Sequence, residues 1–249
     1  NCSHTHTGPM VGKDFASELR STEEYDTFLA NCIRDAVVYA IADLKETKIE
    51  MGEGQAKNIS FIRRYRMKDG YVATNPGVNN PDIVAPIGEL DERVSVVRFD
   101  REGDTTVVLA NYANHTDVVG GTKVSADWPG FVCSTVEQAI DNTSCIFFNG
   151  AQGDVNHVNV HPKAGDFNDM FNDFDDVSRG YGHARHMGNV MAGAVLQVYD
   201  KVNYTDVDSL RFAKKISNLP SNMPKPEDMP LAHKYNDLHN AGKDSEIPY

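Results

Sequence analysis

The chain has 249 residues, of which 40% are hydrophobic and 24% charged, which is enough for one α/β domain with a core of its own. Lys and Arg number 24 against 36 Asp and Glu, and the formal charge of −12 argues against general affinity for nucleic acid or anionic lipid surfaces. No apolar run approaches the roughly 20 residues that a membrane span needs, so we expect a small-molecule partner and no transmembrane segment.

The first half of the chain predicts one helix and one hairpin. A capping box at residues 21–24 precedes apolar residues at helical spacing, which predicts an amphipathic helix running to about residue 44. Residues 94–99 and 105–110 are rich in β-branched side chains and flank a Gly-containing turn, so they predict two antiparallel strands.

The middle of the chain predicts a strand that is followed by a polar loop. A short helix is expected around residues 134–140, followed by an apolar strand at 145–148. That strand leads into the Gly-rich segment 149–154, and such loops are where α/β proteins place chemistry.

The last third predicts a second helix and a looser tail. Residues 164–177 are rich in Asp and fit a solvated connection better than a calcium loop, because the spacing misses the calcium-loop pattern. A helix is expected at 182–200, a strand-like segment at 208–216 and a helical piece at 227–241. We expect an α/β fold of mixed β-sheets with flanking helices in a single domain spanning residues 1–249.

The four cysteines are expected to carry free thiols. Cys2, Cys32, Cys133 and Cys145 form no C-x-x-C pair, and two of them lie in apolar periodic segments. Neither this pattern nor the rest of the sequence decides between a secreted and a cytoplasmic location, or fixes the oligomeric state.

A pair of histidines near the start of the chain is the first candidate for chemistry. His4 and His6 alternate along an extended segment, so both imidazoles point to one face and can reach one ion or one substrate. The turn expected at Gly8-Pro9 keeps the pair at the end of its segment. A surface position for both histidines is the competing interpretation.

Other candidates lie further along the chain. His115 follows a predicted strand in a loop, where it is a ligand or a hydrogen-bonded loop residue. Arg63 belongs to a local basic cluster whose guanidinium groups could bind a carboxylate or an oxyanion, or pair with acidic side chains. His157 and His161 do not form a helical pair because Pro162 and β-branched neighbours disfavour a helix there.

Four short segments together resemble the catalytic domain of the neutral/alkaline non-lysosomal ceramidase family, in the same order. They are SHTHTGP at residues 3–9, NYANH at 111–115, SADWPG at 125–130 and GDVN at 153–156. The resemblance implies a zinc amidase, a hydrolase that cleaves N-acylsphingosine or a related N-acyl amide, and it implies an α/β catalytic domain around the zinc. It also implies that residues 1–249 are part of a longer chain.

The resemblance assigns roles residue by residue. His4 and His115 match the zinc-binding histidines, His6 matches a histidine near the scissile amide that would shuttle a proton or bond the substrate, and Arg63 matches an active-site arginine. The family's other two zinc ligands, a glutamate and a tyrosine, have no matching segment in these residues.

The GDVN segment departs from the family's GDVSPN pattern. Asn156 stands where the family has a serine proposed to be catalytic. An amide can donate a hydrogen bond to a carbonyl oxygen or oxyanion but cannot form an acyl-enzyme through a hydroxyl. We therefore expect any hydrolysis to use zinc-bound water directly.

Two other functions stay open. A His-x-His segment also occurs at the start of metal-dependent hydrolases of other classes, some of which are (β/α)₈ barrels. The hairpin predicted at 94–110 disfavours a regular barrel of that kind. The chain could also be a non-catalytic, lipid- or glycan-binding relative, because the serine is replaced and two of the family's zinc ligands are not located in these residues.

Overall fold

The computed structural model describes residues 2–9, 11, 22–162, 180–207, 209–219 and 225–247. The chain divides into two compact units, Asn1–Val207 and Asp208–Tyr249. The first unit carries a mixed sheet with helices, which confirms the expected α/β class. The acidic stretch predicted at 164–177 lies outside the described residues.

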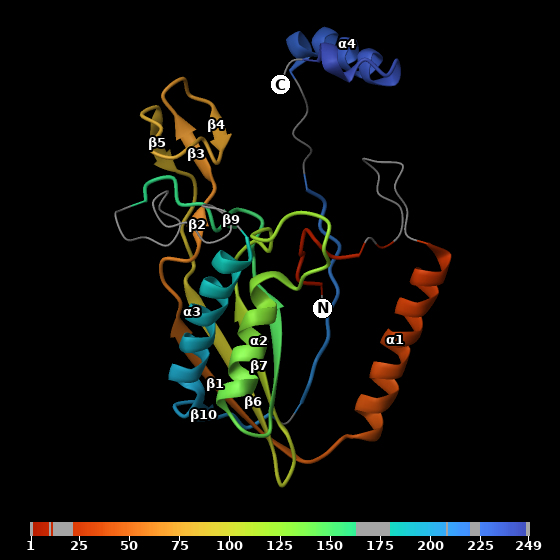
Figure 1. Ribbon diagram of the computed structural model, residues 1–249, viewed down its shortest axis with the longest axis vertical. Helices are drawn as coiled ribbons and strands as arrows, with labels where there is room; N and C mark the ends of the chain where they lie inside the picture. The colour runs from red at the N-terminus through yellow and green to blue at the C-terminus, as the bar shows by residue number, and fades with distance from the viewer. Residues whose placement is uncertain are drawn as a thin grey trace. The chain divides into compact units, whose positions relative to one another are not determined.

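The main sheet has five strands in the order β10-β1-β6-β7-β8 (Figure 1). They are β1 (Thr47–Gln55), β6 (Arg93–Arg101), β7 (Thr106–Tyr112), β8 (Thr143–Asn149) and β10 (Asn203–Tyr204). The predicted hairpin is the antiparallel β6–β7 pair, and the predicted apolar strand lies within β8. Because β8 runs parallel to β7, both strands end at the same edge of the sheet, and their loops meet there.

Two helices, α2 (Asp127–Ala139) and α3 (Tyr181–Tyr199), pack side by side on one face of this sheet (Figure 1). Alternate strand residues face them and form the buried core: Val94, Val96, Val108, Ala110 and Phe147. The opposite face carries more accessible apolar side chains, including Met51 and Ile146. The core therefore lies between the sheet and the α2–α3 pair, directly below the loops that follow β7 and β8.

Two small sheets extend from this edge. One pairs β2 (Phe61–Ile62) with β9 (Val155–Asn156), and the other places β3 (Arg64–Met67) between β4 (Val72–Thr74) and β5 (Ile83–Pro86). The β2–β9 pairing brings the Arg63 segment to the Gly-rich loop although the two are 90 residues apart.

Helix α1 (Glu23–Ala42) is the predicted amphipathic helix, capped by Thr22, whose Oγ1 accepts a hydrogen bond from the Tyr25 amide (3.1 Å). It buries none of its side chains. The predicted helix at 134–140 is also found, but α2 begins earlier, at Asp127. All four cysteines carry free thiols, as expected.

The second unit contains α4 (Met229–Asn240) with the short 3-10 helices η1 (Pro226–Asp228) and η2 (Asp244–Glu246). The strand predicted at 208–216 is wrong for the residues that are described there, because 209–219 form no ladder. Phe212 is 91% exposed, so the alternating apolar pattern has no sheet to join. None of the helices in the described ranges has the length and apolar character required to cross a membrane.

Candidate metal centre

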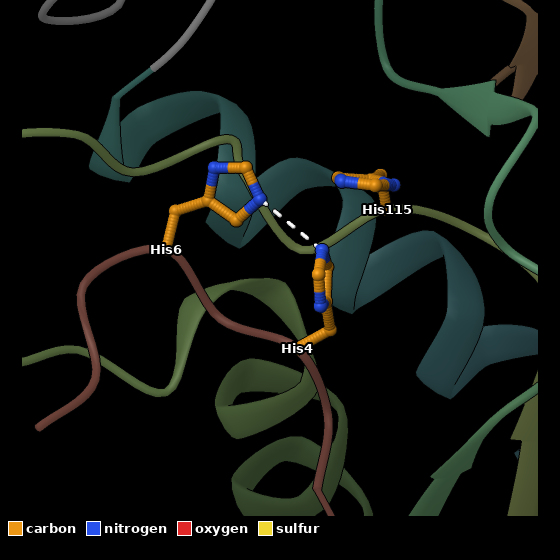
Figure 2. A group of neighbouring side chains, drawn as sticks. All are labelled: His4, His6 and His115. Atoms are coloured by element: carbon orange, nitrogen blue, oxygen red, sulfur yellow. Dashed lines mark hydrogen bonds between the residues drawn. The ribbon is translucent and has the colours of Figure 1, made fainter. Parts of the chain in front are cut away.

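Three histidines from two distant segments meet at the carboxyl edge of the main sheet. His4, His6 and His115 each offer a ring nitrogen, and these atoms all lie within 4.8 Å of one another. The rings point toward one another in Figure 2, and the Nε2 atoms of His4 and His6 are 3.4 Å apart. His4 and His6 are exposed, whereas His115 is buried, so the group opens to solvent on one side.

The N-terminal segment is held against the loop that follows β7 by hydrogen bonds on both sides of His4. The His6 amide donates to the Thr116 carbonyl (3.1 Å), and Thr116 Oγ1 donates to the Ser3 carbonyl (2.5 Å). The Ser3 carbonyl also accepts from Asn149 Nδ2 (3.1 Å) at the end of β8. His4 itself has a φ of 67°, a left-handed conformation that non-glycine residues seldom adopt and that neighbouring contacts must enforce.

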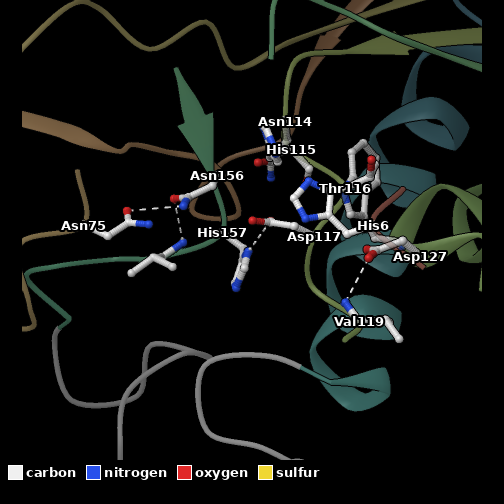
Figure 3. Close-up of polar contacts among 12 residues, drawn as sticks. His6, Asn75, Asn114, His115, Thr116, Asp117, Val119, Asp127, Asn156 and His157 are labelled. Atoms are coloured by element: carbon white, nitrogen blue, oxygen red, sulfur yellow. Dashed lines mark hydrogen bonds and ion pairs between the residues drawn. The ribbon is translucent and has the colours of Figure 1, made fainter. Parts of the chain in front are cut away.

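The SADWPG segment fixes the backbone of the loop that carries His115 through hydrogen bonds. The Asp127 carboxylate accepts hydrogen bonds from the amides of Val119 (2.9 Å) and Trp128 (2.7 Å), the first of which is drawn in Figure 3. Trp128, which is fully buried, donates from its indole Nε1 to the His115 carbonyl (3.0 Å). The start of α2 therefore fixes the backbone of the loop that carries His115.

The ring of His115 is held in one orientation by a backbone carbonyl. Its Nδ1 lies 3.2 Å from the Gln152 carbonyl oxygen, which only accepts, so Nδ1 carries the proton and the Nε2 lone pair remains for a metal. Burial lowers the pKa of His115, and the positive charges of Arg63 and His4 lower it further, against the Gln152 bond and Asp117, which raise it. A neutral imidazole is the form that binds metals.

The donor set fits zinc. Neutral imidazoles are preferred zinc ligands, and catalytic zinc sites commonly have three protein ligands and one open position. For Zn–N bonds of about 2.0–2.1 Å, two nitrogens at neighbouring corners of a tetrahedron are about 3.4 Å apart. The His4–His6 separation of 3.4 Å equals that spacing.

Arg63 lies between β2 and β3, beside the Gly-rich loop. Its amide donates to the Asp154 carbonyl (3.1 Å), and its Nη2 donates to the Gly153 carbonyl (2.5 Å). Because Gly153 follows Gln152, which orients His115, the guanidinium is tied to the same loop as the histidine ring.

Asn156 lies in β9 and is 1% exposed. Its Nδ2 donates to Asn75 Oδ1 (3.2 Å), as Figure 3 shows, and its Oδ1 accepts from the Val158 amide (3.1 Å). The amide group thus holds β9 to the Asn75 turn. Its expected contact with a carbonyl or oxyanion stays a prediction.

The sequence did not single out a hydrogen-bonded His–Asp pair that the fold forms beside this group. His157 Nδ1 lies 3.2 Å from Asp117 Oδ1 (Figure 3), and both side chains are largely buried. The ring of His183 packs edge-on against His157, with the ring centroids 5.3 Å apart. Burial raises the pKa of Asp117, but the His157 hydrogen bond and the charges of His157, His115 and His6 outweigh it and lower that pKa to about 2. The His115-x-Asp117 spacing was the available signal, because alternate residues of an extended loop share a side.

No protein-family model matches the sequence, and no curated protein matches it significantly. Among solved structures, the chain is similar to neutral ceramidase from Pseudomonas aeruginosa and to a ceramidase complexed with C2, each with a TM-score of 0.58 and 18% sequence identity. Each match covers 80% of this chain and 30% of the ceramidase chain. The chain therefore has a ceramidase-like fold and spans about a third of the length of these structures.

Proposed function

We propose that the chain is the metal-binding part of a zinc-dependent amide hydrolase of the neutral ceramidase type. The observation that carries this proposal is the convergence of His4, His6 and His115, whose ring nitrogens all lie within 4.8 Å. The ceramidase-like fold supports it, and so do the four sequence segments that resemble that family, because three of them build or brace the histidine group.

His4 and His115 are the ligands that the sequence resemblance implies, and the spacing of His6 supports a third ligand at the same ion. A zinc ion held there would act as a Lewis acid toward a carbonyl oxygen and would make a water molecule acidic enough to attack it. The proton-transfer role expected of His6 is the competing assignment for that residue.

The remaining residues act on the substrate and on the loop. Arg63 presents a guanidinium to a substrate oxygen from a position fixed by the Gly153 carbonyl. Gln152 holds the His115 ring in one tautomer. Since Asn156 has no hydroxyl, the reaction proceeds by direct attack of water, without an acyl-enzyme formed at that position.

Hydrolysis is tested with the zinc-loaded chain and a panel of N-acylsphingosines, fatty acid ethanolamides and N-acyl amino acids, with released fatty acid as the readout. The proposal expects release from at least one amide and loss of release in His115→Ala. Saturable binding of the amides with no release from any of them would contradict hydrolysis and favour the non-catalytic binding protein.

A further inference from the structure

An open pocket of about 610 Å³ lies along the loop whose Gln152 carbonyl oxygen orients His115. It is lined by Arg63, Arg64, Thr74, Ala151, Gly153 and Asp154. None of these residues has a large apolar side chain, so the pocket does not offer the lining that a long alkyl chain requires.

One of the two lining arginines is already neutralised. Arg64 forms a two-point ion pair with Asp154, Nε to Oδ1 at 2.5 Å and Nη2 to Oδ2 at 3.0 Å. Arg63 bonds the Gly153 carbonyl, and in the described part of the chain no carboxylate lies within ion-pair distance of it. The lining therefore keeps one uncompensated positive charge, in a chain whose formal charge is −12.

Arg63 is partly exposed, and only one of its guanidinium N–H groups, at Nη2, is engaged by the Gly153 carbonyl, which leaves other N–H groups to bind a ligand. The wall of the pocket beside Arg63 is formed by residues of the loop 151–154. The Gln152 carbonyl of the same loop orients His115. A substrate whose scissile amide reaches the histidines can thus place a neighbouring group in the pocket.

We propose that this neighbouring group is a carboxylate bound by Arg63, so that the substrates are N-acyl amino acids rather than N-acylsphingosine. This inference rests on the proposed amide hydrolysis. A single guanidinium matches the charge and planar geometry of one carboxylate. A phosphate dianion would leave excess negative charge, because Asp154 also lines the pocket.

The test compares two probes that share an acyl chain and an amide. N-octanoylglycine ends in a carboxylate, and N-octanoylethanolamine ends in a hydroxyl. Calorimetric titration of the metal-free 249-residue chain measures the affinity for each. Because only the glycine conjugate can pair a carboxylate with the guanidinium through charge-assisted hydrogen bonds, we expect it to bind about 10-fold to 100-fold more tightly.

Variants locate the preference. Arg63→Gln should abolish it, and Arg63→Lys, which keeps the charge but loses the planar fork, should retain part of it. Arg66→Gln is the matched control, because Arg66 is an exposed arginine of β3 that does not line the pocket. Thermal unfolding checks that each variant is folded.

Equal affinity of the wild-type chain for the two probes, or no binding of the glycine conjugate, would overturn the inference even if every variant failed to fold. Survival of the preference in a folded Arg63→Gln variant would also overturn it. Because zinc and turnover play no part in this titration, its failure is separate from failure of the proposed function. Conversely, tight binding of the glycine conjugate without hydrolysis by the zinc-loaded chain would contradict the hydrolase alone.

Discussion

The indole Nε1 of Trp128 donates a hydrogen bond of 3.0 Å to the backbone carbonyl of His115. This bond joins the first turn of α2 to the loop that presents a proposed zinc ligand. It explains why a segment with no metal-binding side chain of its own, SADWPG, accompanies the histidines: it holds one of them in place.

Trp128→Phe should therefore weaken both folding and zinc binding. It leaves the buried His115 carbonyl without its donor, a loss of about 1–3 kcal/mol in the free energy of unfolding, measured by urea denaturation. Tyr112→Phe is the control, because it removes a buried bond to the Ala56 carbonyl in the same core. We expect a similar loss of stability there with unchanged zinc affinity. Equal zinc affinity in the two variants would refute a role for Trp128 in positioning His115.

Helix α3 packs against α2 at Gly188. A Cβ atom there would lie 2.3 Å from the Phe131 Cβ and 2.9 Å from the Trp128 carbonyl. Gly188→Ala should thus destabilise the chain by about 1–3 kcal/mol through overpacking, as measured by thermal or urea unfolding. Gly193→Ala, on the exposed side of the same helix with no neighbour within 4 Å, should be neutral or stabilise by about 0.5–1 kcal/mol. A similar effect of the two substitutions would show that the helices do not approach each other so closely.

His186, also in α3, has a pKa lowered by burial. Below the unfolded-state value of about 6.5 the unfolded chain binds this proton and the folded chain resists it. The free energy of unfolding therefore has its full value above that pH. It declines as the pH falls toward the lower pKa that His186 has in the folded chain. We expect His186→Gln to reduce the difference between urea unfolding at pH 7.5 and at pH 5.5 in the metal-free chain. The exposed His233 supplies the control, and an identical pH dependence in His186→Gln and His233→Gln would be inconsistent with this account.

The role of His6 is decided by metal affinity. If it is a third ligand, as its 3.4 Å separation from His4 favours, His6→Ala weakens zinc binding along with activity. If it only transfers protons or bonds the substrate, zinc affinity is unchanged and the dependence of hydrolysis on pH changes instead. Equilibrium zinc titration of His6→Ala, beside its pH–rate profile, separates these outcomes.

Much of the architecture followed from periodicity, and the exceptions have physical causes. The β6–β7 hairpin and α3 have clean alternation or a clear apolar stripe, and both were predicted. Strand β1 was missed because Gly52 and Gly54 disfavour a strand in isolation. In the fold these glycines admit the Val198 side chain, which a Cβ would meet at 2.5 and 2.7 Å.

Helix α2 begins earlier than predicted because Pro129 reads as a helix breaker although proline is tolerated in a first turn. The segment predicted at 208–216 has strand-like alternation, but a strand also needs a partner, and the sequence pattern does not provide one.

For the candidate site, the His-x-His segment and the loop histidine were recognisable from residue type and position. The Asp117–His157 pair was not, because it depends on the β2–β9 pairing and on the meeting of the loops after β7 and β8. The uncompensated charge of Arg63 could not be predicted either. Arg63 and Arg64 are neighbours in the sequence, and only the fold shows that Arg64 is the one that pairs with Asp154.

The central claim is that His4 and His115 hold zinc, and metal content tests it most directly. The chain should bind one equivalent of zinc after purification and loading, measured by elemental analysis and competitive titration. His4→Ala and His115→Ala should each lose the bound zinc, while His233→Ala, an exposed histidine of α4, should keep it. Zinc content that is unchanged in folded His4→Ala and His115→Ala would contradict the account.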